Sequence, residues 1–344
     1  MRLVSRILIA VLVVAFLAPP AHAWFRTPAT RFATLPPGAA HPEGITADAH
    51  GNIYVTTFAV AGTSSGVGQI FVFNKHGRLI REVNVAGSST FLLDLAFHPE
   101  SGVLLVLDFG ASKVLSVDPV SGASTVFSDI SAGGQPGLNV LTFDRDGNVY
   151  VSASFAGAIY KIAPGGGPAA TWVQSDLLTT TGVPGFGANG LAFNRAQTTL
   201  FVNNTGNDTV VKIPVNGNGT AGTPAVFVNA VNGADGLIVD DHDNLWIAAN
   251  QADEIVVIDP SGRTIAKLGD FDGLDRDGAP LGLLFPASLV FSGPFVYVTN
   301  LAIDLRLFGA ANATGDSPWT ADVKVHTISR IPAFIPPIHG LPGH

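Results

Sequence analysis

Six short segments of the chain share one pattern: a polar residue, an apolar run, a turn and a second apolar run. The polar residues at this variable position are Glu43, Asp94, Asn139, Asn189, Asp235 and Ser288. Carboxylate and amide oxygens are the ligands that Ca²⁺ prefers in proteins. A repeat with a purely structural role does not need this mixture of acids and amides, whereas a site for a hard cation does.

The spacing of these residues predicts the architecture that would bring them together. Successive positions lie 51, 45, 50, 46 and 53 residues apart, and repeats of this length that hold several short strands are typical of propeller blades. We therefore predict an all-β fold, a six-bladed β-propeller with four-stranded antiparallel blades. The fifth repeat shows the pattern most clearly, with predicted strands at residues 237–239, 245–248, 254–258 and 264–267.

The last repeat lacks a strand, and the N-terminal part of the chain supplies one. The third strand of the sixth blade is predicted at residues 323–328, after which too few residues remain for a convincing fourth strand. Residues 30–35 form a spare β-type segment before the first repeat. We predict that this N-terminal strand completes the sixth blade and closes the ring, because an open propeller would expose a sheet edge.

The innermost strands of a propeller surround a central tunnel, and a residue at the start of each strand can point into it. Glu43, Asn139, Asn189 and Asp235 are therefore expected to converge on one divalent cation, Ca²⁺ or another ion of this kind. Four side chains leave coordination positions open for water and a substrate oxygen, which a catalytic metal requires. The alternative is that these residues form the polar lining of a water-filled channel.

Three residues are candidates for the chemical step. Asp235 is either a metal ligand only or a carboxylate nucleophile. Asp94 either accepts a proton from water at the metal or simply solvates the channel. His41, two residues before Glu43, is a candidate general base. The alternative for His41 is a loop histidine that is hydrogen-bonded to the backbone.

Long loops are predicted on the face of the ring where the inner strands begin. They span residues 57–69, 269–286 and 301–321, and loops gathered on one face of a rigid scaffold often shape a site. The alternative is tolerated surface decoration. Five aromatic residues are predicted near this face, where they either line an apolar substrate pocket or pack into the core: Phe58, Phe91, Phe109, Phe155 and Phe186.

The start of the chain has the form of a secretory signal peptide. Arg2 and Arg6 precede an apolar stretch, and residues 21–23 read Ala-His-Ala, a small-residue cleavage site. We expect residues 1–23 to be removed and residues 24–344 to form a single propeller domain that is secreted or periplasmic. The alternative is an uncleaved anchor.

Composition narrows the classes of partner. The chain has no cysteine, which excludes disulfides, thiolate metal sites and a cysteine nucleophile. Its net charge is −8 and its sequence holds no basic cluster, which argues against nucleic acid and, after signal cleavage, against a membrane surface. We expect a monomer that acts on a small-molecule substrate.

Four short segments carry a resemblance to a known family. Residues 234–240 and 244–248 read Ala-Asp-Gly-Leu-Ile-Val-Asp and Asn-Leu-Trp-Ile-Ala, which resembles the most recognisable segment of the gluconolactonase, senescence-marker-protein and luciferin-regenerating-enzyme family. This family includes regucalcin and is related to diisopropylfluorophosphatase. Glu43 in Pro-Glu-Gly matches its first-blade acidic ligand, Asn189 its mid-chain Asn ligand and Asp235 its later Asp ligand. Asn139 falls where phosphatase-type members place a second Asn.

The resemblance implies a six-bladed propeller, a central divalent ion that is usually calcium, and hydrolysis of lactones or organophosphates. The chain also departs from the family pattern. It lacks the Arg/Asn pair with which sugar-lactone members hold substrate hydroxyls, and Ser288 stands where some relatives have a site histidine. Asp94 adds a third carboxylate near the ring. These departures concern the substrate more than the metal.

The leading hypothesis is an exported, calcium-dependent hydrolase of a lactone or related small ester, with phosphotriester hydrolysis at the same site as the neighbouring alternative. A non-enzymatic propeller that binds protein or glycan is the alternative from another class. Residues 144–151 also resemble the repeats of NHL-type interaction propellers, and residues 201–204 and 297–300 those of surface-layer proteins. A metal-free relative of the strictosidine-synthase type is a third alternative. The asymmetric set of Glu, Asn, Asn and Asp favours the hydrolase.

Overall fold

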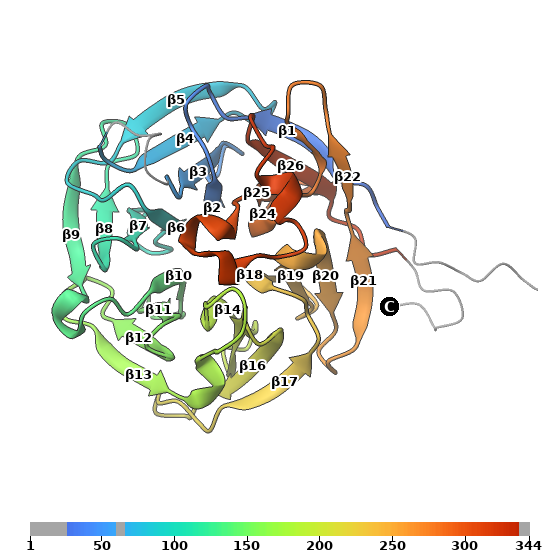
Figure 1. Cartoon of the computed structure of the whole chain (residues 1–344). Coiled ribbons are helices and arrows are strands. Elements are labelled where there is room, and N and C mark those ends of the chain that lie inside the picture. The colour runs from blue at the N-terminus through green and yellow to red at the C-terminus, as the bar shows by residue number, and fades with distance from the viewer. Residues whose placement is uncertain (1–25, 60–65, 337–344) are drawn as a thin grey trace, which may run out of the picture.

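The protein forms a ring of six antiparallel sheets, each with four strands, around a central axis (Figure 1). The structure is a computed structural model that describes residues 26–59 and 66–336. The predicted all-β, six-bladed propeller is therefore confirmed. The predicted signal peptide lies outside the described residues.

The strands follow each other from the axis outward in every blade. Blades 1 and 2 consist of β2 (Pro42–Ala47), β3 (Ile53–Thr57), β4 (Gln69–Phe73) and β5 (Leu79–Asn84), and of β6 (Leu92–Phe97), β7 (Leu104–Asp108), β8 (Lys113–Val117) and β9 (Ser124–Asp129). Blades 3 and 4 consist of β10 (Leu138–Phe143), β11 (Val149–Ala153), β12 (Ala158–Ile162) and β13 (Ala170–Gln174), and of β14 (Ala188–Phe193), β15 (Thr199–Asn204), β16 (Thr209–Pro214) and β17 (Ala225–Asn229). Blades 5 and 6 consist of β18 (Ala234–Val239), β19 (Leu245–Ala249), β20 (Glu254–Ile258) and β21 (Thr264–Leu268), and of β24 (Pro286–Ser292), β25 (Phe295–Asn300), β26 (Thr327–Pro332) and β1 (Thr30–Thr34).

The remaining elements are short and lie between strands. A two-stranded hairpin, β22 (Phe271–Leu274) with β23 (Pro280–Gly282), occupies the region predicted as a loop at 269–286. The described residues contain one short α-helix, α2 (Ser317–Thr320), and five 3₁₀ turns: η1 (Ser131–Gly133), η2 (Asp176–Leu178), η3 (Asn250–Ala252), η4 (Leu305–Phe308) and η5 (Ala310–Asn312). No helix within the described ranges is long and apolar enough to cross a membrane.

Burial explains why the apolar runs in the sequence became strands. The second strand of a blade is packed on both faces, so every residue of β7 and of β19 is buried, and the sequence is apolar throughout β19 and in β7 up to its last residue, Asp108. The outer strands are largely exposed and more polar, as in β5 and β13. The core lies between neighbouring sheets, where for example Ile70 and Val83 of blade 1 pack in one cluster with Leu104 of blade 2.

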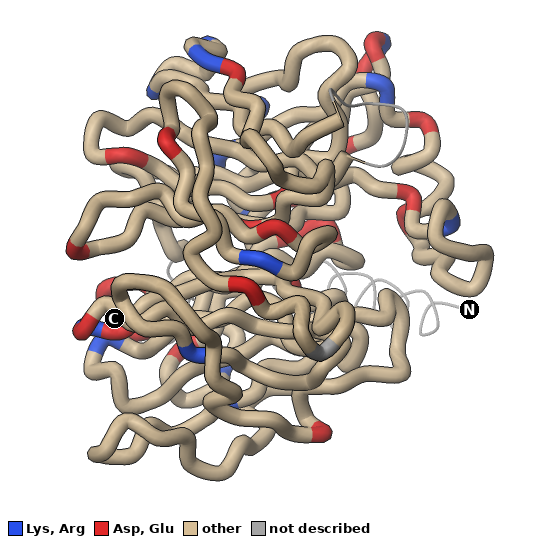
Figure 2. Tube along the Cα trace, turned by 90° about the vertical axis from the view of Figure 1, so that its left-hand side faces the viewer, with Lys and Arg blue, Asp and Glu red and all other residues tan. Residues whose placement is uncertain are grey.

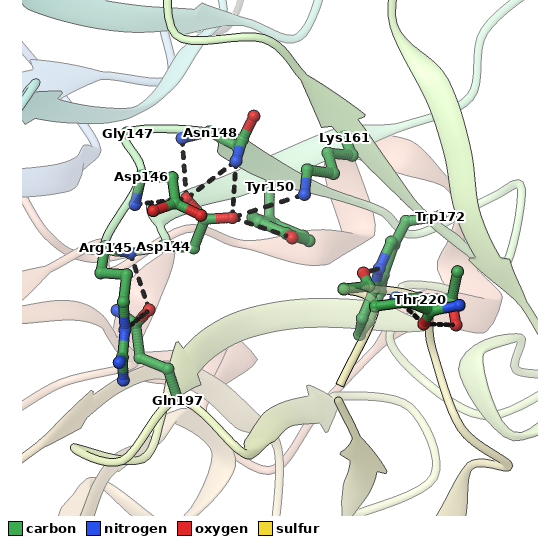
Figure 3. Close-up of polar contacts among 12 residues, drawn as sticks. Asp144, Arg145, Asp146, Gly147, Asn148, Tyr150, Lys161, Trp172, Gln197 and Thr220 are labelled. Atoms are coloured by element: carbon green, nitrogen blue, oxygen red, sulfur yellow. Dashed lines mark hydrogen bonds and ion pairs between the residues drawn. The ribbon is translucent and has the colours of Figure 1, made fainter. Parts of the chain in front are cut away.

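A carboxylate fixes the turn between the first and second strands in three blades. In blade 3, Asp144 Oδ1 accepts hydrogen bonds from the backbone N–H groups of Asp146 (3.0 Å) and Asn148 (2.9 Å), and the same carboxylate accepts from the Tyr150 hydroxyl (3.1 Å) (Figure 3). Lys161 Nζ lies 3.4 Å from Asp144 Oδ2. Asp48 in blade 1 and Asp240 in blade 5 hold the equivalent turns in the same way. These three turns lie on the face of the ring opposite the face where the inner strands begin.

The N-terminal strand closes the ring, as predicted. β1 pairs antiparallel with β26, from Thr30 opposite Arg330 to Thr34 opposite Thr327. The turn before β5 packs closely against β1. Gly77, at φ +80°, lies next to the Phe32 carbonyl, and there is no room for a side chain at this position. The equivalent Gly122 in blade 2 meets the outer strand of blade 1 in the same manner. β1 therefore has the position of an ordinary outer strand toward the next blade.

The prediction for the third strand of blade 6 was displaced by four residues. The strand was expected at 323–328, and β26 spans Thr327–Pro332. Its core positions are Ile328 and Ile331, both fully buried. The preceding residues instead join the hairpin, where the Lys324 N–H donates to the Gly278 carbonyl (2.9 Å). The β-branched residues at 323 and 325 looked like a strand in sequence, but the core lies further along the chain.

Charged residues are scattered and mixed in sign over the described part of the molecule when it is viewed from the side (Figure 2). The 26 acidic residues outnumber the 18 basic ones. This view shows no continuous basic stripe within the described ranges.

We expect a charge on the inner face of β1 to open the ring. Ala33 is 5% exposed, so Ala33→Asp would bury an unpaired carboxylate and should reduce the free energy of unfolding by more than about 2 kcal/mol. Thr34→Asp, at an exposed position of the same strand, is the matched control and should change it by less than about 0.5 kcal/mol. Denaturant unfolding measures both. Equal effects would show that β1 is not needed for closure.

Candidate functional site

Strand pairing identifies which residues of the six inner strands are equivalent. In every blade, one residue at the start of the first strand pairs with the end of the second, and the residue after it faces the axis. These axial residues are Glu43, Leu93, Asn139, Asn189, Asp235 and Ala287. Glu43, Asn139, Asn189 and Asp235 are four of the six residues that the sequence pattern selected.

The other two were assigned to the wrong register. Asp94 and Ser288 lie one residue after the axial position, and their blades place Leu93 and Ala287 there instead. The paired register shifts by a bulge that spans the axial residue and the residue after it in all six inner strands. The sequence pattern could not show this, because a polar residue on either side of the bulge fits the same apolar run.

The four axial polar residues line one cavity at the centre of the ring. Each is almost completely buried, with exposures between 2% and 5%. The structure thus brings together the set that the sequence predicted to converge.

Several oxygen atoms in this cavity have no hydrogen-bond partner. Among the described residues, the buried unpartnered side-chain atoms include Glu43 Oε2, Asn139 Oδ1, Asn189 Oδ1 and Asn250 Oδ1. The amide nitrogens are occupied elsewhere: Asn139 Nδ2 donates to Ser154 Oγ (3.2 Å) and Asn189 Nδ2 to Thr205 Oγ1 (2.9 Å). Each asparagine therefore keeps its oxygen free, which leaves a group of acceptors without donors.

A second set of polar residues orients the axial ones, and sequence patterns did not predict it. Ser154, Thr205 and Asn250 each come directly after the second strand of their blade. Asn250 Nδ2 donates to Asp235 Oδ2 (3.0 Å), and Ser154 and Thr205 accept from the axial asparagines of their own blades. The signal that could have found them is a polar residue 15 or 16 positions after three of the four axial polar residues, Asn139, Asn189 and Asp235.

The carboxylates of the cavity lie in an unfavourable electrostatic environment. Burial, together with the charges of Asp235 and Asp94, raises the pKa of Glu43 well above its ordinary value. Burial also raises the pKa of Asp235, although hydrogen bonds from Asn250 and Asn189 partly oppose this. None of the described residues that line the cavity is Lys, Arg or His. A cation in the cavity would therefore stabilise the ionised carboxylates.

The donor set fits a hard divalent cation by its chemistry. The described residues contain no group of three or more His, Cys, Asp or Glu placed to hold a metal ion. The cavity instead combines two carboxylates with amide oxygens, and amide oxygens are ordinary ligands of Ca²⁺. The four unpartnered oxygens described above are the observation in favour of such an ion.

Asp94 faces a different cavity. It lines a second hollow on the opposite side of the axial residues, together with Val140 and Leu191. Its Oδ2 accepts a hydrogen bond from the Leu141 N–H (2.9 Å), which connects blade 2 to blade 3. Burial raises the pKa of Asp94 to about 7, and its charge influences Glu43. The structure therefore places Asp94 near the site but not among the residues that line it.

His41 also lies outside the cavity lining. Its Nδ1 is 3.1 Å from the Leu301 carbonyl oxygen, and its ring packs edge-on against His326 with centroids 4.6 Å apart. Burial lowers the pKa of His41 and, with the charge of His41, lowers that of His326 to about 3. His41 thus has the backbone-bonded geometry that was the alternative to a general base.

Loops cover the cavity from the face where the inner strands begin. The segment after β25 crosses the centre of the ring (Figure 1) and contributes Leu301, Ile303, Leu305 and Phe308 to the lining. The other two predicted loops contribute Phe58 and Phe285, and residues 60–65 lie outside the described ranges. A further loop, at residues 175–187, adds Pro184 and Phe186 and was not predicted. We call residues 301–321 the cover segment.

A pair of carboxyl groups joins the cover segment to blade 5. Asp253 Oδ1 accepts a hydrogen bond from the Phe285 N–H (2.7 Å), and the carboxyl group of Asp316 lies close enough to influence the pKa of Asp253. Burial and the nearby charge of Asp316 raise the pKa of Asp253 well above its ordinary value. Repulsion between the two carboxyl groups is therefore avoided while the pair shares a proton.

The comparisons with known proteins agree with this geometry. The sequence model of the SMP-30/gluconolactonase/LRE-like region matches residues 95–269, just over half of the chain. The chain belongs to this family. The matched region contains Asn139, Asn189 and Asp235, whereas Glu43 precedes it. No curated protein matches the chain significantly by sequence.

Solved structures of family members share the fold. A calcium-binding regucalcin from Agrobacterium tumefaciens is 18% identical, with a TM-score of 0.61 over 91% of this chain and 100% of that one. A gluconolactonase from Xanthomonas campestris is 16% identical, with a TM-score of 0.60 over 92% and 99%. A luciferin-regenerating enzyme is 17% identical, with a TM-score of 0.59 over 87% and 94%. At these identities the similarity establishes the fold of this chain and nothing more specific.

The Asp253–Asp316 pair predicts a pH dependence of stability. A carboxyl group whose pKa is raised in the folded state holds a proton that the unfolded chain has lost, so stability falls as pH rises above about 4. Asp253→Asn keeps an acceptor for the Phe285 N–H and removes the charge. The melting temperature of this variant minus that of the unmodified protein should therefore increase from about pH 5 to about pH 8.

The control is Asp241→Asn, because the Asp241 side chain is 92% exposed in its ion pair with Arg195. Its melting temperature should follow that of the unmodified protein at every pH. A constant difference between Asp253→Asn and the unmodified protein across this range would contradict the shared proton.

Proposed function

We propose that the protein is a lactonase-type hydrolase that acts on a small ester with the help of a divalent cation, Ca²⁺ in the first instance. Membership of the SMP-30/gluconolactonase/LRE-like family supports the reaction class, and the gluconolactonase and the calcium-binding regucalcin among its structural neighbours support the substrate type and the ion. The observation that carries the proposal is the group of buried oxygens without hydrogen-bond partners at the centre of the ring.

Unpartnered oxygens of this kind are expensive in a folded protein. A buried acceptor without a donor costs about 1–3 kcal/mol, and three of the proposed ligands, Glu43, Asn139 and Asn189, carry one each. A divalent cation would be held by Glu43, Asn139, Asn189 and Asp235, and Asn250 would orient Asp235 from behind. When bound, such an ion supplies Lewis acidity toward a carbonyl or phosphoryl oxygen.

The roles of the candidate catalytic residues differ in the proposal. Asp235 alone among Asp235, Asp94 and His41 lines the cavity, so it is the candidate to contact a substrate. Whether it acts as a ligand or as a nucleophile, Asn250 holds its Oδ2 and sets the direction of the other oxygen. Asp94 affects the site through its charge on Glu43 and through the Leu141 hydrogen bond. His41 bonds to the start of the cover segment at Leu301.

We also propose that the protein acts after export. The basic start, the apolar stretch and the Ala-His-Ala site at residues 21–23 support removal of residues 1–23 by a signal peptidase. The mature protein would then act in the periplasm or outside the cell as a monomer. N-terminal sequencing of the exported protein tests the cleavage site.

Cation binding should be directly measurable. Ca²⁺ should raise the melting temperature of chelator-treated protein, because an ion bound only by the folded state stabilises it by about 2.7 kcal/mol at 100 times its Kd. Asn189→Leu removes one oxygen ligand at similar volume and should weaken binding at least ten-fold by calorimetric titration. Asn232→Leu, at an exposed asparagine, is the matched control. The absence of any calcium-dependent heat or stabilisation in the unmodified protein would refute the cation site.

Hydrolysis should depend on the same residues. Calcium-loaded protein should open the ring of simple γ- or δ-lactones, and Asp235→Asn should lower kcat/KM at least 100-fold, because it removes a charge that faces the substrate cavity. The assay should include aromatic esters and phosphotriesters. Protein with proven cation binding that hydrolyses no member of this panel would instead be a binding propeller whose ion stabilises the ring.

A further inference from the structure

The cavity is divided into a polar floor and apolar walls. Of its fifteen lining residues, six are polar, and all six come from the axial positions or from the positions directly after the second strands. The other nine are Phe, Leu, Ile or Pro. The walls include Phe58, Phe186 and Phe308, and the cover segment contributes four of the nine. A ligand in this cavity therefore meets oxygen atoms at one end and hydrocarbon along its sides.

The described part of the walls offers a substrate no hydrogen-bond partner from a side chain. The described wall residues include no Ser, Thr, Tyr, Gln, Trp, Lys or Arg. A sugar lactone carries several hydroxyl groups, and each one buried without a partner would weaken binding about ten-fold. A cation held at the floor could bind the reacting carbonyl, and the floor oxygens could accept from a hydroxyl that reaches them, but the floor could not reach hydroxyls around a whole ring. The cavity is thus poorly matched to a polyhydroxylated substrate.

The apolar walls continue outward as a band of aromatic rings. Phe58 contacts Phe308 (centroids 6.2 Å apart) and Phe109 (5.8 Å), and Phe109 contacts Phe155 (5.8 Å), which in turn contacts Phe186 (5.4 Å). We call these five rings the aromatic band. Phe155 and Phe308 are each 49% exposed, so the band extends from inside the cavity to the surface. Aromatic side chains left exposed beside a cavity are a common sign of an apolar ligand.

We propose that the site takes lactones that carry a hydrocarbon chain, with the lactone carbonyl on the polar floor and the chain along the aromatic band. This inference rests on the proposed lactonase function and specifies its substrate class. The aromatic band gives the chain a continuous apolar surface, and each methylene that leaves water for such a surface gains about four-fold in affinity. Sugar lactones are disfavoured by the same walls.

The test measures both turnover and binding over a series of chain lengths. The calcium-loaded protein is assayed with γ-butyrolactone, γ-hexalactone, γ-octalactone and γ-decalactone, and with D-glucono-δ-lactone. We expect kcat/KM to rise by two-fold to four-fold for each added methylene until the chain passes the end of the band. D-glucono-δ-lactone should be hydrolysed at least 100-fold less efficiently than γ-octalactone. Equal or better use of the sugar lactone would overturn the inference and leave the lactonase function intact.

Binding of γ-lactams with the same chains separates the two proposals. Lactams resist hydrolysis, so their affinity, measured by the shift in melting temperature, reports on the walls without turnover. If no lactone is hydrolysed but lactam affinity rises with chain length, the lactonase function fails and the apolar site stands. Affinity that is independent of chain length overturns the apolar site whether or not any lactone is hydrolysed.

A variant of the band provides the matched comparison. Phe308→Ala shortens the aromatic band at a half-exposed residue, so the fold should survive and the gain per methylene should fall toward one-fold. Phe186→Ala, from a different loop, should have the same effect and guards against a local rearrangement of the cover segment. Phe334→Ala removes a 60% exposed ring that is not part of the cavity and should leave the chain-length series unchanged. A normal series in both Phe308→Ala and Phe186→Ala would overturn the inference.

Discussion

The site depends on how closely the six inner strands approach one another around the axis. Side chains of one blade hold the backbone of the next at this point: Thr299 Oγ1 donates to the Glu43 carbonyl (2.6 Å), and Asn203 Nδ2 donates to the Asp235 carbonyl (2.6 Å). Gly190 has no room for a side chain because the backbone at Asp235 lies against it. The position of each axial residue is therefore set partly by its neighbour, and an open ring would lose the whole set at once.

The polar network of the floor passes from blade to blade for the same reason. Thr205 accepts from Asn189 and donates to the Ala234 carbonyl (2.8 Å), directly before Asp235. Ser154 accepts from Asn139 and donates to the Ala188 carbonyl (2.6 Å), directly before Asn189. Each hydroxyl thus fixes one axial side chain and the backbone of the next axial residue. Because the hydroxyl protons are committed to carbonyl groups, the amide nitrogens turn toward the hydroxyls and the amide oxygens turn toward the axis.

The blades could be predicted well from the sequence because buried strands are apolar and the turns between them are not. A strand packed on both faces, such as Leu245–Ala249, reads as a continuous apolar run between turn residues. The predicted strands of blade 5 agree with the structure within a few residues, and so does the closing strand. The displaced strand at Thr327–Pro332 shows the limit: β-branched residues also occur in connections, and only the core determines which apolar residues pack.

The site was predictable in part. The convergence of the four axial polar residues follows from the repeat, but the register at Leu93 and Asp94 does not, because a bulge is invisible in an apolar run. Asn250 was missed because its function depends on a hydrogen bond across a hairpin. The apolar character of the cover segment could be read from the sequence, but its position over the axis depends on tertiary contacts such as that between Asp253 and Asp316.

The residues around the axis differ from blade to blade, and this leaves Glu43 with fewer hydrogen-bond partners than the other axial polar residues. The axial residues on either side of Glu43 are Leu93 and Ala287, in the two blades that flank blade 1, and the residue after its second strand is Phe58 instead of a polar group. Asn139 and Asn189 have hydroxyl partners and Asp235 has an amide partner. Glu43 therefore lacks the support that the other three receive, and its Oε2 has no donor. An uncharged Glu43 would tolerate this apolar setting, so a cation that enters the cavity must displace its proton, and cation affinity should be coupled to proton release.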